Sequence, residues 1–402
     1  MSETESLSRP VFDGLKVVEF GLLIAGPLAG TLLADLGAEV IHVEEPGVGD
    51  PTRRLGLDKD GHNLLWVAGS RNKRSVTLDL ASPEGQGVAR RLAAWADVVI
   101  VNYRNKALQR WGLDWDTLHE LNPTLVMLQV SGFGTDTTKR DAPGFGRVGE
   151  AMSGVVHLTG HAGQPPVHAG FPHGDSVTAL MGAFAISAAL TMRDRDDFAG
   201  EYIDLALFET LYRLIDWQVV VYDQLGLAAE RAGNQLAISP GSVVNTYETS
   251  DDRYVTVSSG TPRSVQNVAV LLGHPADEFA TADQQRGQRD RLDAGLRTWI
   301  KSRPLAECLE RMAECEVVAA PIFSAADIVA DETYRERGDV ISVDDPVLGP
   351  VRMPSVIPKF RNHGGRVWRT GPALGEDNEL VYREFLGIDE HAYRQLEANG
   401  TI

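Results

Sequence analysis

Residues 15–131 alternate short runs of β-branched and other apolar residues with stretches of helical spacing. A strand-like run at Leu15–Phe20 is followed by a helix-like run at Pro27–Leu36 and a second strand-like run at Glu39–Glu44. The alternation continues to a strand-like run at Leu125–Val130. Strands that alternate with helices predict a parallel sheet with helices on its faces. The sequence therefore predicts an α/β fold with a doubly wound, mostly parallel sheet.

A second domain is expected beyond this layer, because 402 residues exceed the size at which one hydrophobic core usually keeps growing. Gly, Asn, Pro and Ser cluster over residues 233–242, as is typical of a linker. Strand-like and helix-like runs resume after it. We predict a large Rossmann-like domain over residues 1–230 and a smaller α/β domain over residues 240–330.

Four other stretches have patterns of their own. Residues 134–175 are rich in Gly, Pro and His and predict a long functional loop. The run 176–192 has no charged residue and predicts a buried helix. One long helix is predicted from Phe208 to about Leu225. The tail from Asp331 is expected to be irregular until a final helix around 377–386.

The charge balance argues against a nucleic-acid partner. The formal net charge is −18 with a pI near 5.0, whereas a phosphate-binding surface requires clustered Lys and Arg. Ser, Thr and Gly dilute the run 176–192, so a membrane span is not expected. The segment Met1–Glu5 is acidic and does not resemble a signal peptide. Cys308 and Cys315 suit neither a disulfide framework nor a zinc site, and we expect a cytoplasmic location.

Asp175 is the most informative single residue. It lies in the glycine-containing stretch Gly170–Ser176, directly before the charge-free run. The unpaired N–H groups at a helix N-terminus favour a carboxylate by ~0.3–1 kcal/mol. The common role of an aspartate there is a helix cap, and a nucleophilic role is the alternative.

Other candidate sites have weaker patterns. Four histidines fall within seventeen residues, but the Gly and Pro residues among them disfavour the helical frame that zinc ligands at this spacing would need, so no metal is expected. One of the four, His173, stands two residues before Asp175. It is either a solvent-facing loop histidine or a participant in the chemistry. Ser131 follows a strand without an evident base partner. The histidines are His157, His161, His168 and His173.

The junction after the first predicted strand, Gly21–Gly30, breaks the Gly-x-Gly-x-x-Gly spacing of dinucleotide sites. Its small residues still allow a ligand to approach the backbone at the start of a helix. Arg104 and Arg110 follow the strand-like run Val98–Val101. At the carboxyl end of a parallel strand they are placed either to bind phosphates or simply as surface arginines.

Several ordered motifs together resemble one family. The chain is similar to the class III CoA-transferases, the group that contains formyl-CoA transferase and carnitine CoA-transferase. The matching motifs are Ala25–Pro27, Leu33–Ile41, Asn72–Ser75, Asp97–Tyr103, Ser131–Gly134, Ala151–Gly154, Gly174–Asp175 and Leu374–Asn378.

The resemblance implies that Asp175 is the catalytic nucleophile, which carries first the acyl group and then CoA. It also implies oxyanion or loop roles for Gly174 and Gly260, although the loop Ser258–Thr261 is poorer in glycine than in formyl-CoA transferase. CoA is expected as a substrate, with no other cofactor. The implied CoA-binding residues are Leu23, Ile24, Ala25, Leu78, Asn102, Tyr103, Arg104 and Arg110.

Two other functions stay open. The related α-methylacyl-CoA racemases have a histidine after the glycine that matches Gly144, and this chain has Phe145, which cannot carry a proton. A non-catalytic CoA-binding protein is the other alternative. The tail Pro358–Arg369 resembles the carnitine CoA-transferase branch, and Trp217 and Tyr222 suit a trimethylammonium acceptor through cation–π contact.

The family forms a homodimer of two subunits threaded through each other. The resemblance therefore implies an interlocked homodimer that acts on an acyl-CoA and a carboxylic acid. It also implies that the chain returns near residue 330, so that residues 331–402 complete the large domain.

Overall fold

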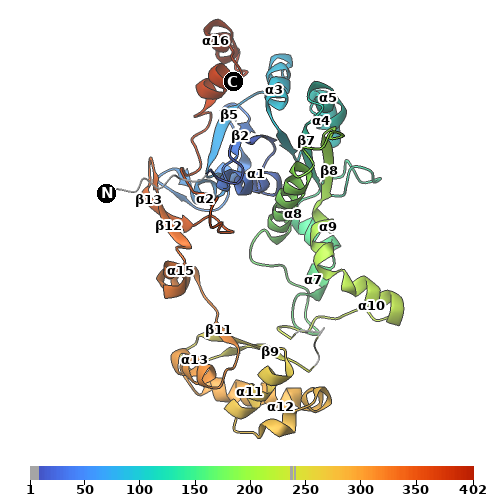
Figure 1. Ribbon diagram of the computed structural model, residues 1–402, viewed down its shortest axis with the longest axis vertical. Helices are drawn as coiled ribbons and strands as arrows, with labels where there is room; N and C mark the ends of the chain where they lie inside the picture. Colours follow the sequence, from blue (N-terminus) through green and yellow to red (C-terminus); the bar gives the residue numbers. More distant parts are fainter. Residues whose placement is uncertain (1–8, 236–238, 240) are drawn as a thin grey trace. The chain divides into compact units, whose positions relative to one another are not determined.

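The structure is a computed structural model that describes residues 9–235, 239 and 241–402. The start of the predicted large domain (1–8) and part of the predicted linker (236–238 and 240) lie outside the described residues. The chain divides into two compact units (Figure 1). The first unit runs up to Val155 and includes Ala169–Asp216 and Arg335–Ile402. The second unit comprises Val156–His168 and Trp217–Tyr334.

The first unit is built on a sheet of six parallel strands in the order β5-β2-β1-β6-β7-β8. The strand order reverses direction between β1 and β6, as in a Rossmann fold. The predicted doubly wound parallel sheet is therefore confirmed. The strands are β1 (Lys16–Phe20), β2 (Glu39–Glu44), β5 (Lys73–Thr77), β6 (Val98–Val101), β7 (Val126–Ser131) and β8 (Glu201–Ala206).

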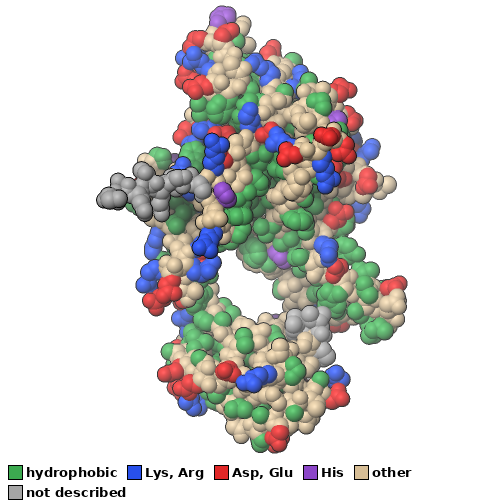
Figure 2. Space-filling model, in the orientation of Figure 1, with side chains coloured by type: hydrophobic (Ala, Val, Ile, Leu, Met, Phe, Trp, Pro, Cys, Tyr) green, Lys and Arg blue, Asp and Glu red, His purple; other side chains and the backbone are tan. Residues whose placement is uncertain are grey.

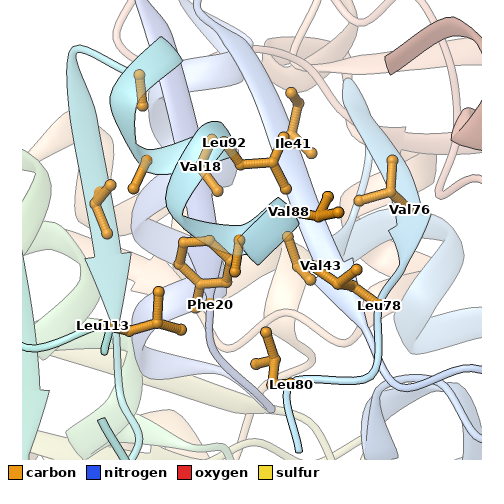
Figure 3. Close-up of a cluster of buried hydrophobic side chains, with 14 of the residues drawn as sticks. Val18, Phe20, Ile41, Val43, Val76, Leu78, Leu80, Val88, Leu92 and Leu113 are labelled. Carbon is orange, nitrogen blue, oxygen red and sulfur yellow. The ribbon is translucent and has the colours of Figure 1, made fainter. Parts of the chain in front are cut away.

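Alternate side chains of the strands form two separate cores, because successive residues of a strand point to opposite faces. On one face, Val18 and Phe20 pack with Leu92 of α3 (Pro83–Trp95) (Figure 3). On the other face, Val17 packs among residues of α1 (Ala25–Asp35) and α8 (His173–Leu190). The remaining helices of this layer are α4 (Asn105–Trp111) and α5 (Trp115–Leu121).

The small residues of α8 allow close packing against the sheet. A Cβ added at Gly182 would lie 2.7 Å from Leu128 of β7 and 3.7 Å from Ala29 of α1. The Thr178 hydroxyl donates to the carbonyl of Gly174 one turn earlier. Among the described residues, no helix combines the length and apolar character that a bilayer crossing requires.

Two predictions between residues 134 and 225 were wrong. The predicted loop contains α6 (Gly146–Met152) and α7 (Val155–Leu158). The glycines of α6 disfavour a helix locally, but they allow it to pack closely: a Cβ at Gly149 would lie 2.8 Å from Leu207 Cβ. The long helix is broken into α9 (Leu207–Tyr212), a 3₁₀ turn (Arg213–Ile215) and α10 (Trp217–Leu225), where the chain passes between units.

The second unit contains a three-stranded antiparallel sheet in the order β11-β10-β9. Three helices pack on its apolar core, which includes the buried Cys308; both cysteines are free. The elements are β9 (Val243–Glu248), β10 (Tyr254–Ser259), β11 (Ala319–Pro321), α11 (Pro262–Leu271), a 3₁₀ turn (Ala276–Phe279), α12 (Ala282–Lys301), α13 (Leu305–Glu314) and α14 (Ala325–Ala330).

The tail is more regular than predicted. It contains a hairpin whose turn is held by Asp345, which accepts the N–H groups of Val347 and Leu348 at 2.9 Å. A π-helix takes the place of the predicted final helix, and another helix follows it. The elements are α15 (Glu332–Glu336), β12 (Val340–Asp345), β13 (Gly349–Pro354), the π-helix (Leu380–Phe385) and α16 (Glu390–Ala398).

The tail also covers the free edge of β5. Asp377 accepts the N–H of Ser75 at 3.0 Å and pairs with Arg74. Asn378 accepts the N–H of Thr77 at 2.8 Å. These side chains satisfy edge donors that would otherwise be open to pairing with another strand. The short elements near this region are a 3₁₀ turn (Pro51–Arg54), β3 (Asp58–Lys59), β4 (His62–Asn63) and α2 (Leu64–Gly69).

Candidate active site

A cavity of about 170 Å³ opens at the carboxyl ends of β1, β6 and β7. This is the place where the strand order reverses, and open α/β sheets bind ligands there. The walls come from the turns after these strands, from the segment before α6 and from the first turn of α8. The lining residues are Leu22, Leu23, Ile24, Ala25, Asn102, Tyr103, Val130, Ser131, Gly132, Gly144, Phe145, Asp175 and Leu207.

Asp175 lines this cavity from the first turn of α8, and its side chain is half-buried. Gly146 of α6 faces it so closely that an added Cβ would lie 2.7 Å from Asp175 Cγ and overlap Oδ2. Only glycine fits at position 146 with the carboxylate in this place. The carboxylate is thus confined between two helices on one side and open to the cavity on the other.

Burial and the negative charge of Glu150 raise the pKa of Asp175 to about 6, against the weaker opposing effect of a backbone hydrogen bond. Glu150 lies on α6 and is only 2% exposed. At neutral pH Asp175 is ionised but poorly solvated. Such a carboxylate is a better nucleophile than one surrounded by water.

Gly174 is tied to the same glutamate. Its N–H donates to Glu150 Oε1 at 3.0 Å, and Glu150 Oε2 lies 3.2 Å from Arg147 Nη1. The Gly174 N–H is therefore occupied in this structure, and it can serve an oxyanion only by exchanging this bond. Gly260 belongs to the second unit, where it follows β10 and has open space around its α-carbon.

The structure brings five of the predicted CoA-binding residues together in the cavity wall. Asn102 uses its amide to hold the loop after β1: its Oδ1 accepts the Leu22 N–H at 2.9 Å, and its Nδ2 donates to the Leu22 carbonyl at 2.7 Å. Burial, with the charges of Asp50 and Glu45, raises the pKa of Tyr103, so its hydroxyl stays protonated. The five residues are Leu23, Ile24, Ala25, Asn102 and Tyr103.

The other three predicted residues lie outside this wall. Leu78 is 1% exposed and packs in the core, so its side chain does not reach the cavity. Arg104 precedes α4 and Arg110 lies in its last turn. Both arginines are exposed, and neither makes an ion pair with the described part of the chain.

Phe145 lines the cavity at the position where a racemase would have its histidine. His173 is the first residue of α8 and its ring lies 5.5 Å from that of Phe171. The other three histidines of the cluster belong to the second unit. Across residues 9–235, 239 and 241–402, no three His, Cys, Asp or Glu side chains gather as metal ligands would.

Gly146 and Glu150 are site residues that were not predicted from the sequence, although both lie next to positions that carry the family resemblance. Glu150 is the only acidic residue between Asp141 and Asp175, in a stretch of small and apolar residues. An isolated acid in such a stretch is a usable signal, because a buried carboxylate requires partners.

The chain is similar to known proteins along most of its length. The model of CoA-transferase family III matches residues 12–378. Succinyl-CoA:D-citramalate CoA-transferase of Chloroflexus aurantiacus is 36% identical over 98% of each chain. Succinate–glutarate CoA-transferase of Agrobacterium fabrum is 32% identical over 96% of this chain and 98% of its own.

A crystal structure of a CAIB/BAIF family protein from Brucella suis superimposes with a TM-score of 0.82 at 32% identity. It covers 94% of this chain and all of its own. The chain therefore belongs to CoA-transferase family III and is a class III CoA-transferase.

Proposed function

We propose that this enzyme moves CoA from an acyl-CoA to a free carboxylic acid through covalent intermediates on Asp175. The observation that carries the proposal is the place of Asp175. It is the one ionisable carboxylate among the described residues that line the cavity at the switch point of the sheet.

The first half of the reaction loads the enzyme with CoA. An Asp175 oxygen attacks the thioester carbonyl carbon, the C–S bond breaks, and a mixed anhydride and CoA thiolate form. The thiolate then attacks the Asp175 carbonyl carbon of the anhydride. The C–O bond to the donor acyl group breaks, the donor leaves as a carboxylate, and an aspartyl-CoA thioester remains.

The second half reverses these steps with a new acid. The acceptor carboxylate attacks the aspartyl thioester and expels CoA thiolate, which forms a second anhydride. The thiolate then attacks the acceptor's carbonyl carbon, which releases the new acyl-CoA and free Asp175. Each attack needs an ionised nucleophile, and no proton has to be transferred.

The binding of CoA is assigned to the loop after β1 and to the turn after β6. Leu23, Ile24 and Ala25 line the cavity together with Asp175. The exposed guanidinium groups of Arg104 and Arg110 are proposed to hold CoA phosphates, because such groups form charge-assisted, bidentate hydrogen bonds with phosphate.

For the substrates, the names of the similar proteins favour succinyl-CoA as donor and a dicarboxylic acid as acceptor. Carnitine is the narrower expectation from the sequence. The two aromatic residues proposed for it, Trp217 and Tyr222, lie on α10 in the second unit, and Tyr222 is 62% exposed. We therefore rank dicarboxylic acids first. A racemase is an alternative, and Phe145 in the cavity wall argues against it. If the enzyme exchanged the α-hydrogen of an acyl-CoA with deuterated water in the absence of an acceptor acid, that result would favour a racemase.

Trapping tests the covalent route. Enzyme incubated with succinyl-CoA and hydroxylamine is expected to lose activity and to carry a hydroxamate on the peptide that contains Asp175, as measured by mass spectrometry. Asp175→Asn is the matched control and should carry none. Modification at another carboxylate, or full transfer with Asp175 unmodified under single-turnover conditions, would contradict the proposal.

The pKa of Asp175 predicts the acid limb of the activity. Because the attacking group must be ionised, kcat/KM should fall about tenfold for each pH unit below about 6. Glu150→Gln keeps an oxygen for the Gly174 N–H but removes the charge, so it should move the midpoint to lower pH. A midpoint near 4 in the unmodified enzyme would contradict this.

The same pKa has a consequence for stability, with the opposite sign from an ion-paired aspartate. A carboxyl with a folded pKa above its unfolded value binds more protons in the folded state. Its ionisation therefore lowers stability as the pH rises from about 4 to about 6. At pH 8 the free energy of unfolding of Asp175→Asn should exceed that of the parent by roughly 1–2 kcal/mol, a figure that allows for solvent screening. At pH 3.5 the two proteins should unfold at the same denaturant concentration.

The homodimer is also a proposal. Apolar side chains of α10 are exposed in the single chain (Figure 2), among them Val219, Val220 and Leu225. Contiguous apolar surface of this kind is typical of a face covered by a partner. Light scattering on the purified protein should give twice the chain mass, and a monomer at micromolar concentration would count against it.

A further inference from the structure

The loop after β1 contains a residue in an unusual conformation. Leu23 has a φ of 65°, in the left-handed region that glycine, asparagine and aspartate tolerate better than leucine. A residue stays in such a conformation only when its surroundings hold it there. Since Leu23 also lines the Asp175 cavity, the group that holds it matters for the site.

Asp50 is that group. The Leu23 N–H donates to Asp50 Oδ2 at 3.0 Å and lies 3.3 Å from Oδ1. The Asp50 side chain is completely buried, and it is not among the residues that line the cavity. Its direct contact with the cavity wall is the hydrogen bond to the backbone of Leu23.

Asp50 is itself fixed by its own neighbours. Its Oδ1 accepts the N–H and the hydroxyl of Thr52 at 2.7 and 2.5 Å. Its own N–H donates to Glu44 Oε2 at 2.8 Å, and Glu44 forms a bidentate pair with Arg53. A carboxylate held from several directions can impose one conformation on the loop.

A buried chain of charges lies behind Asp50. His42 Nε2 lies 3.4 Å from Asp50 Oδ2, and His42 Nδ1 contacts Glu19 Oε2 at 2.7 Å. Lys73 Nζ donates to the same Glu19 oxygen at 2.9 Å. Burial alone would lower the pKa of His42, but its contacts with Asp50 and Glu19 raise it to about 9. His42 is thus charged at neutral pH and balances Asp50.

We propose that Asp50 is a positioning residue for CoA binding, which clamps Leu23 in its left-handed conformation and so fixes the loop Leu22–Ala25. The identity of the ligand rests on the proposed function, whereas the clamp itself does not. Asn102 holds the preceding residue, Leu22, by its own two hydrogen bonds. Together the two side chains fix successive peptide units of the wall.

The proposal predicts a separation between binding and chemistry. Without the clamp, the loop must be ordered by the ligand, and the cost of ordering appears in the dissociation constant. Asp175 belongs to α8 and is not held by Asp50. Loss of Asp50 should therefore raise Kd and KM and leave kcat nearly unchanged.

The test compares the parent with Asp50→Asn and Asp50→Ala. Calorimetric titration with CoA should give a Kd about tenfold higher for Asp50→Asn and higher still for Asp50→Ala, with kcat for succinyl-CoA within about threefold. Hydrogen–deuterium exchange should become faster in the peptide that contains Leu23.

Asp35→Asn is the matched control for lost stability. Asp35 is also buried, and it pairs with Arg71 at the far end of α1 from the loop. The Asp35→Asn variant should unfold at a lower temperature than the parent but bind CoA with the same Kd. If Asp50→Asn binds CoA normally, or if Asp35→Asn raises Kd equally, the inference is wrong.

A second variant covers the case in which Asp50→Ala does not fold. Glycine adopts a positive φ without strain, so Asp50→Asn should raise the Kd less in a Leu23→Gly background than in the parent. An equal effect in both backgrounds would overturn the clamp. If the parent itself does not bind CoA, the proposed function fails, while the exchange of the Leu23 amide still tests the clamp.

Discussion

Asp175→Ala is expected to lower the rate of CoA transfer by at least about 10⁴-fold, because the variant has no group to form the anhydride. The neighbouring carboxylate does not replace it. Both oxygens of Glu150 are engaged, one by the Gly174 N–H and one by Arg147. The rate is measured from the appearance of the new acyl-CoA by chromatography.

A measurement of CoA binding distinguishes the lost transfer rate of Asp175→Ala from a folding defect. Asp175→Ala should bind CoA within a few-fold of the parent, since the loop and the arginines assigned to CoA are unchanged. Asp223→Ala, which removes an exposed carboxylate on α10, is the control and should keep the parent rate. A variant at Asp175 that retains a tenth of the parent rate would refute the covalent route.

The second large effect is expected at Gly146. A methyl group there would lie 2.7 Å from Asp175 Cγ, so either the carboxylate turns away or α6 moves. A displacement of about 1 Å costs roughly 10²-fold in rate when the reacting groups must be aligned. Gly146→Ala should therefore lose about two orders of magnitude in kcat, as measured under saturating acyl-CoA.

Gly87→Ala is the matched control for this substitution. Gly87 lies in the middle of α3, and an added Cβ meets nothing within 4 Å. This variant should keep full activity and gain roughly 0.5–1 kcal/mol of stability, because alanine favours the helix. Retention of kcat within threefold in Gly146→Ala would mean that the carboxylate does not act from this position.

The sheet could be predicted because its strands and helices have strong local patterns. Glu39–Glu44 and Val98–Val101 have the bounds that the sequence predicts. The helix α6 could not be predicted, because its glycines disfavour a helix and its packing against Leu207 and the first turn of α8 exists only in the folded chain. The hairpin of β12 and β13 was missed although Asp345 carries a turn signal.

The site was predictable where it depended on motifs and not where it depended on contacts. Asp175 and the loop Leu23–Ala25 stand out in the sequence. Asp50 does not, and Glu150 shows only as an isolated acid without a role, because the roles of both come from partners 27 and 24 positions away, which only the folded chain brings near.

The tail that covers β5 also sets an order for folding during synthesis. The partners that Ser75 and Thr77 use, Asp377 and Asn378, are made about 300 residues later, after all of the second unit. Because synthesis adds roughly 5–20 residues per second, the N–H groups of Ser75 and Thr77 at the edge of the first sheet lack these partners for many seconds on the ribosome. The second unit is synthesised before these partners. A chain that terminates early leaves an open strand edge that can pair with other nascent chains.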